Sequence, residues 1–171
     1  LSGKFVENIF IIIDSDKIFN LNIGIKKKNY NISINQTYLK NSLKEAKDLF
    51  NENYQNEKIM HMLINKYLIN GNSYSSIEDN MECDNLSLEI QFKSLSENIV
   101  YDLNKLLENY QIKIVRFLDG EYIENFFKNE EKDFPEMIFK ILKGCNQNEV
   151  MVVPKNHKKK AFFEKFFQLF G

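Results

Sequence analysis

The sequence has little of the chemistry that most metal and cofactor sites require. Its 171 residues include two Cys, two His, two Pro, six Gly and no Trp. Cys83 and Cys145 are too few for a disulfide framework and lack metal-site spacing, which indicates a reducing compartment. The chain has only two His, His61 and His157, and so few histidines argue against a zinc or iron centre. Glycine never clusters into a phosphate-binding loop, so we expect neither a metal nor a cofactor.

Long apolar runs and a secretory signal are also absent. No run approaches the roughly 20 apolar residues that a membrane-spanning helix needs, and the first residues lack the charged, apolar and small-residue regions of a signal peptide. Apolar residues still make up 43% of the chain, which is enough for a buried core and excludes a disordered protein. The sequence predicts a cytoplasmic protein of one domain, or one domain plus an appendage.

The net charge of −1 is unevenly distributed along the chain. Residues 155–171 hold five Lys and one Glu, so this tail carries +4 and the other 154 residues carry −5. An acidic body repels phosphate, and Lys and aromatic residues coincide only in the tail. We therefore expect no nucleic-acid partner.

Apolar patterns predict the strands and helices. Residues 5–13, 18–25 and 112–118 are β-branched and aromatic runs, and residues 86–92 alternate apolar with polar as in a half-buried strand. Asn35 is the predicted N-cap of a first helix, and Ser94 with Glu97 forms a predicted capping box for a second. Residues 58–68 fit either a strand or a short helix, whereas residues 26–28 and 71–84 fit turns.

The resulting order is strand, strand, helix, strand, strand, helix, strand. It predicts an α+β domain with a small antiparallel or mixed sheet and two helices on one face. Beyond it, residues 121–127 and 135–142 are predicted helices, and Pro154 precedes the basic tail. The expected parts are an interaction domain (1–119), a helical extension and linker (120–154) and a basic amphipathic helix (155–171).

Residues 5–119 resemble the inserted 1C subdomain of the bacterial cell-division protein FtsA, which has the SHS2 fold. That family has two strands, a polar-capped helix, a Leu-His-Val-hydrophobic-Pro strand and an Ile-x-Asp-Pro turn. The corresponding residues here are Met60-His61-Met62-Leu63-Ile64 and Ile77-Glu78-Asp79-Asn80, which keep the His, Ile and Asp and lose both Pro. The family's Gly-Met-x-Gly-x-Arg-Leu lead into the next strand becomes Met81 to Leu86, which keeps the Met and Leu.

This resemblance implies a non-catalytic interaction module of a cell-division scaffold, which self-associates or contacts division proteins. FtsA itself is an actin-like ATPase, but no Asp-x-Gly-Gly-Gly-Thr-type phosphate loop follows Leu118. The roughly 50 residues that remain cannot rebuild a second actin-like lobe. We therefore expect neither ATP binding nor enzymatic activity. The PilM-like pilus-assembly proteins share the actin-like plan and remain an alternative.

The C-terminal tail carries the clearest signal of a partner. On a helix, its apolar residues occupy an arc of about 160°, and the Lys cluster precedes it, which is typical of an interfacial membrane helix. Each Lys near an anionic leaflet contributes on the order of 1 kcal/mol. FtsA also ends in such a helix, so we expect peripheral attachment to the inner face of the cell membrane. Docking on the protein's own core or on a partner groove is the alternative. The predicted membrane-binding residues are Lys158, Lys159, Lys160, Phe162, Phe163, Lys165, Phe166, Phe167 and Phe170.

One catalytic alternative comes from Asp14-Ser15-Asp16, which follows an apolar strand. In phosphohydrolases of the haloacid-dehalogenase type, the first such Asp attacks phosphorus and Mg²⁺ screens the charge. Asp119 could add a third carboxylate, but we expect Asp14 and Asp16 to belong to a hairpin turn, where Asp suits the backbone. His61 lies in an apolar run, and we expect it to be a hydrogen-bonded packing residue rather than a base. No catalytic residue is assigned.

Overall fold

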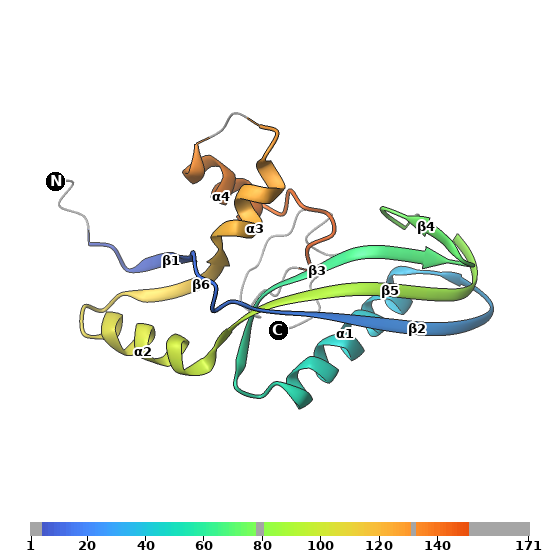
Figure 1. Ribbon diagram of the computed structural model, residues 1–171, viewed down its shortest axis with the longest axis horizontal. Helices are drawn as coiled ribbons and strands as arrows, with labels where there is room; N and C mark the ends of the chain where they lie inside the picture. Colours follow the sequence, from blue (N-terminus) through green and yellow to red (C-terminus); the bar gives the residue numbers. More distant parts are fainter. Residues whose placement is uncertain (1–4, 78–80, 131–132, 151–171) are drawn as a thin grey trace.

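The computed structural model describes residues 5–77, 81–130 and 133–150. Within these ranges the chain has the predicted α+β fold, with four helices and six strands (Figure 1). The predicted C-terminal helix and membrane-binding residues lie outside the described residues. In chain order the elements are β1 (Asn8–Ile13), β2 (Phe19–Ile34), α1 (Gln36–Asn53), β3 (Glu57–Ile69), β4 (Asn72–Tyr74), β5 (Met81–Ser96), α2 (Glu97–Glu108), β6 (Lys113–Asp119), α3 (Gly120–Phe127) and α4 (Phe134–Leu142).

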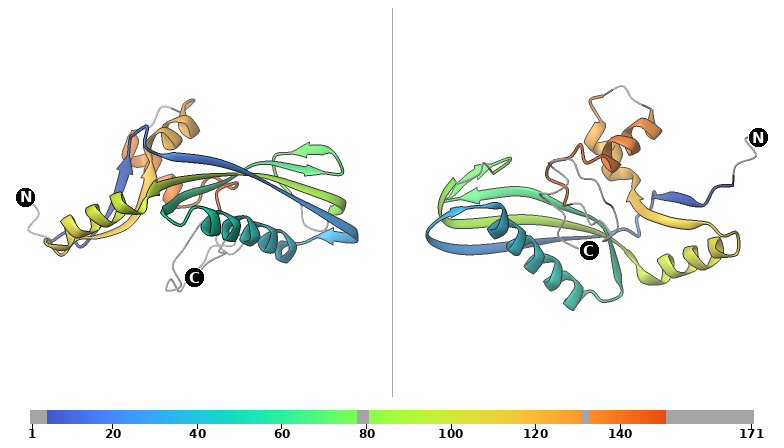
Figure 2. Two further views of the ribbon diagram at one scale, coloured as in Figure 1. Left: turned by 60° about the horizontal axis from the view of Figure 1, so that its bottom comes forward. Right: turned by 180° about the vertical axis from the view of Figure 1, so that it is seen from behind.

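The larger sheet is antiparallel and has the strand order β2-β5-β3-β4. Its central strand, β5, pairs with β2 from Phe19↔Ser94 to Ile34↔Met81 and with β3 from Glu57↔Ser96 to Ile69↔Leu86. The alternation predicted for residues 86–92 places the apolar side chains of β5 on one face, where they are buried. Figure 2 shows α1 running along this sheet.

Helix α1 begins where the sequence predicts, because the Asn35 side chain accepts a hydrogen bond from the backbone N–H of Tyr38 at 2.9 Å. Its apolar residues recur every three or four positions and face the sheet. The Phe50 ring stacks on Phe92 of β5 with centroids 4.7 Å apart. The helix residues in this main core are Leu39, Leu43, Ala46 and Phe50.

A second sheet consists of β1 and β6, which pair in parallel from Asn8↔Lys113 to Ile13↔Asp119. Helix α2 shares a small core with this sheet through Val100 and Phe117. Another small core joins the sheet to α3 and α4. The sequence predicts both helices on one face of one sheet. In the structure they pack on different sheets: α1 packs on the antiparallel sheet, and α2 packs beside the parallel pair of β1 and β6.

Three local predictions are wrong in detail. Residues 26–28 are not a turn, since they lie within β2 and pair with residues 85–87 of β5. The second helix begins at Glu97 without a side-chain cap, because Ser94 still belongs to β5 and donates its hydroxyl hydrogen to Glu57 at 2.6 Å. The stretch 71–84 contains β4 and the start of β5. In each case pairing between strands determines the structure.

Candidate functional site

A buried group of polar side chains lies where β3 of the larger sheet meets β6 of the smaller one. At its centre is Glu149, which follows α4 and is 1% exposed. One carboxylate oxygen of Glu149 accepts a hydrogen bond from Arg116 and lies 2.8 Å from His61 Nδ1. The other accepts a hydrogen bond from the Tyr122 hydroxyl at 2.9 Å. We call Glu149, His61, Arg116 and Tyr122 the Glu149 cluster; it joins β3, β6, α3 and the segment after α4.

The hydrogen bonds of His61 fix its ring as the neutral tautomer with the proton on Nδ1. The backbone N–H of Asp119 donates to Nε2 at 2.9 Å, so Nε2 carries no proton. The proton therefore resides on Nδ1, which donates to Glu149. Both nitrogens are occupied and the side chain is buried, so His61 has no free lone pair for a general base. His61 is a hydrogen-bonded packing residue, as predicted.

The Glu149 carboxylate is ionised although it is buried. Burial by itself raises the pKa of Glu149, but the hydrogen bond from His61 and the positive charge of Arg116 outweigh it and hold the pKa below its usual range. Burial and the neighbouring carboxylate raise the pKa of Tyr122, so its hydroxyl keeps its proton and donates. His61, Arg116 and Tyr122 together therefore stabilise the buried negative charge of Glu149.

A second buried ion pair adjoins this cluster. Lys93 Nζ of β5 donates to Asp119 Oδ2 at 2.6 Å. The other carboxylate oxygen of Asp119 accepts from the backbone N–H of Tyr122 at 3.2 Å and so caps α3. The negative charges of Glu149 and Asp119 balance the positive charges of Arg116 and Lys93. No described buried side-chain nitrogen or oxygen lacks a hydrogen bond. A fully satisfied network of this kind specifies one packing arrangement and offers no free group to a ligand.

The three carboxylates of the phosphohydrolase alternative, Asp14, Asp16 and Asp119, differ in their exposure to solvent. Ile13 pairs with Asp119, so Asp14 follows β1 at the same end of the sheet as Asp119. Asp14 and Asp16 are exposed, whereas Asp119 is buried against Lys93. Across residues 5–77, 81–130 and 133–150, no group of three or more His, Cys, Asp or Glu side chains is placed to hold a metal ion. Asp119 is thus unavailable as the third carboxylate.

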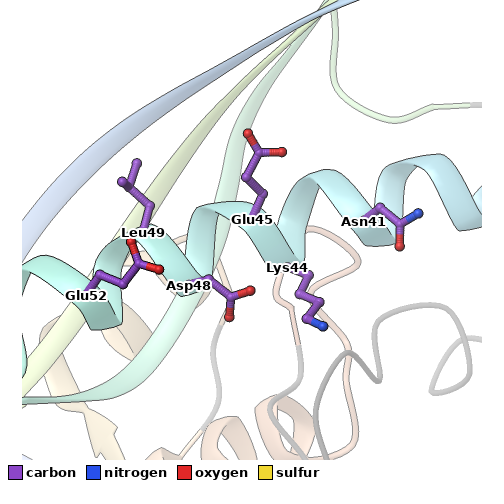
Figure 3. A pocket seen from close by; sticks show the side chains of 6 residues that line it. All are labelled: Asn41, Lys44, Glu45, Asp48, Leu49 and Glu52. Atoms are coloured by element: carbon purple, nitrogen blue, oxygen red, sulfur yellow. The ribbon is translucent and has the colours of Figure 1, made fainter.

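A surface depression of about 430 Å³ lies on the outer side of α1 (Figure 3). Its described lining comes from successive turns of this one helix, and Glu45 in it is held by an ion pair with Lys27. Binding sites for small molecules usually gather polar groups from several elements around an apolar cavity. The described lining of this depression has neither feature. Its lining residues are Asn41, Lys44, Glu45, Asp48, Leu49 and Glu52.

The outer edges of the two sheets differ in protection. In the described part of the chain, β2 pairs only with β5, and β1 pairs only with β6. The β2 edge carries three consecutive lysines and a pairing irregularity after Lys28, two devices that discourage further strands from adding. The six residues of β1 carry no charge, and the extra residue in its pairing, Val115, belongs to β6. Phe5, Val6 and Phe10 are 62%, 56% and 46% exposed.

The sequence predicts His61 as a hydrogen-bonded packing residue, but it does not predict the network around it or the part that Glu149 and Lys93 take in that network. Their signals are weak, because an acid before an apolar run and a Lys in an alternating strand are both common on surfaces. Arg116 offered more, as the only Arg in a Lys-rich chain. No described helix is long and apolar enough to cross a membrane. Neither a protein-family model nor a curated protein matches this chain.

Proposed function

We propose that this chain is a non-catalytic protein-interaction module, similar in role to the 1C subdomain of FtsA, at the inner surface of the cell membrane. The element order supports this proposal, since two strands, a helix, two long strands, a helix and a strand follow one another as in that subdomain. The closed state of the buried network also favours binding over catalysis, because its charges are satisfied internally.

The unprotected edge of β1 is the observation that carries the proposal. A strand edge presents backbone N–H and C=O groups that pair readily with another strand. The protein protects the β2 edge with lysines and leaves β1 apolar and uncharged, with large apolar residues exposed beside it. An edge that must stay free would need the protection that β2 has. The difference between the protected β2 edge and the unprotected β1 edge indicates that β1 pairs with a partner strand.

Photo-cross-linking tests the interaction. A photoreactive phenylalanine analogue at position 10 is expected to form a specific protein adduct in cells that produce the chain, because Phe10 lies on the unprotected strand. The matched control places the analogue at position 49, since Leu49 on α1 has a similar exposure of 42%. Adducts at position 10 no more abundant than at position 49 would contradict the proposed function.

Membrane attachment is a separate prediction that rests on the sequence of residues 155–171. The full chain is expected to co-sediment with anionic liposomes, and a chain ending at Pro154 is expected to stay in the supernatant. Binding should weaken with added salt, because the Lys contribution is screened over roughly 10 Å at 0.1 M ionic strength. Neutral liposomes are the control. Equal sedimentation of the two chains would exclude the tail as the anchor.

A further inference from the structure

We propose that the occupant of the β1 edge is β1 of a second copy of this chain, paired antiparallel across a two-fold axis. This inference rests on the proposed function, because it names the partner of the same edge. Its starting point is that a two-stranded parallel sheet is an incomplete structure. Parallel strands are normally found in larger sheets with neighbours on both sides.

The backbone of β1 has groups directed away from β6. The backbone carbonyl of Glu7 accepts a hydrogen bond from the backbone N–H of Lys113 at 2.8 Å, so the backbone groups of Glu7 are directed toward β6. Backbone groups of successive residues in a strand point to opposite sides. Asn8, Phe10 and Ile12 therefore direct their N–H and C=O groups to the outer edge, where a third strand would pair.

The side chains of β1 suit pairing with their own copies. Ile11 and Ile13 pack toward the core shared with α2, and Ile12 packs toward the core shared with α3 and α4. A two-fold axis perpendicular to the sheet places residues of the same face opposite each other, so isoleucines meet isoleucines. Asn8–Ile13 carries no charge, and this neutral stretch can approach its copy although residues 1–154 sum to −5.

Closure favours a second copy over an unrelated strand. Pairing of β1 with its copy builds a four-stranded sheet in the order β6-β1-β1-β6, and both unprotected edges disappear. On its other side, β6 lies near β3, since Arg116 of β6 donates to the carbonyl oxygen of Met60 at 3.4 Å. A strand from another protein would instead leave a new free edge. In the two-fold arrangement, by contrast, no β1 edge remains free.

Sedimentation velocity of the full chain over a range of concentrations tests the proposal. The wild type is expected to form a reversible dimer. Phe10→Lys is expected to raise the dimer dissociation constant at least about tenfold, because a protective charge enters the interface. Leu49→Lys is the matched control, because it also replaces a large apolar residue of similar exposure with Lys, and it should dimerise as the wild type does.

Amide hydrogen exchange provides a second measurement that needs no variant. The amides of Asn8, Phe10 and Ile12 are expected to become more protected as concentration rises, while amides of the lysine-protected β2 edge do not change. This readout decides the question if Phe10→Lys fails to fold. Protection of β1 that does not change with concentration would overturn the proposal.

Two further outcomes would also overturn it. A chain that stays monomeric at every concentration does not pair with itself, and a dimer equally tight in folded Phe10→Lys uses another surface. Failure here is distinguishable from failure of the proposed function by the photo-cross-link at position 10. A specific adduct with a different protein preserves the interaction module and excludes self-pairing, whereas an adduct with the chain itself supports both.

Discussion

Replacing Glu149 with Ala is expected to lower the free energy of unfolding by about 3–5 kcal/mol. The change removes the acceptor for Arg116, His61 and Tyr122 at once, and all four side chains belong to one buried cluster. The Arg116 guanidinium would then lack its buried counter-charge. The loss would appear in chemical denaturation followed by circular dichroism.

A surface glutamate provides the control for this variant. Glu136 forms an i, i+4 ion pair with Lys140 at 3.2 Å, and its side chain is 50% exposed. Glu136→Ala should cost no more than about 0.5 kcal/mol, because exposed pairs of this kind contribute little. Similar losses for Glu136→Ala and Glu149→Ala would contradict the assignment of Glu149 as the centre of a buried cluster.

The pH dependence of stability distinguishes the charge of Glu149 from its packing. The folded-state pKa lies below the unfolded value of about 4.3, so the charge contribution is fully present above that pH. It is lost as the pH falls through the lowered folded pKa. The difference in unfolding free energy between wild type and Glu149→Ala should therefore shrink in acid. A constant difference would mean that packing alone causes the loss.

Much of the fold could be predicted because it is encoded locally. The alternation at residues 86–92 requires only that one face of a strand be buried. The Asn35 cap of α1 and the Pro135 signal for the beginning of α4 each depend on a few adjacent residues. These signals need no knowledge of the rest of the chain, and the corresponding elements are present.

The errors and the missed residues arise where distant segments decide the structure. Three consecutive lysines suit solvent and so predict a turn at residues 26–28, but an outer strand also exposes its side chains to solvent. The pattern of residues 58–68 fits either a strand or a short helix, and pairing with β5 decides for the strand. His61 and Glu149 are 88 positions apart, and Arg116 and Glu149 are 33 apart. No local pattern relates such residues.

Asp119→Asn is expected to cost about 3 kcal/mol of unfolding free energy through the loss of charge alone. Asn is as good an N-cap as Asp, so the cap of α3 should persist, while Lys93 would keep its charge without a partner. Asp133→Asn is the matched control, because Asp133 caps α4 at an exposed position through the same contact, accepting from the backbone N–H of Glu136 at 3.0 Å. It should change stability by only a few tenths of a kcal/mol.

A second substitution at Lys93 isolates the buried ion pair. In the Asp119→Asn background, Lys93→Met removes the unpartnered charge and keeps most of the aliphatic volume, so it should recover most of the lost stability. In the wild-type background, the same substitution leaves Asp119 without its counter-charge and should be destabilising. A double-mutant cycle from denaturation curves then gives the coupling energy of the pair. Recovery by Lys93→Met supports a paired charge at this position; additive losses would mean that Lys93 and Asp119 contribute independently to the junction of the two sheets.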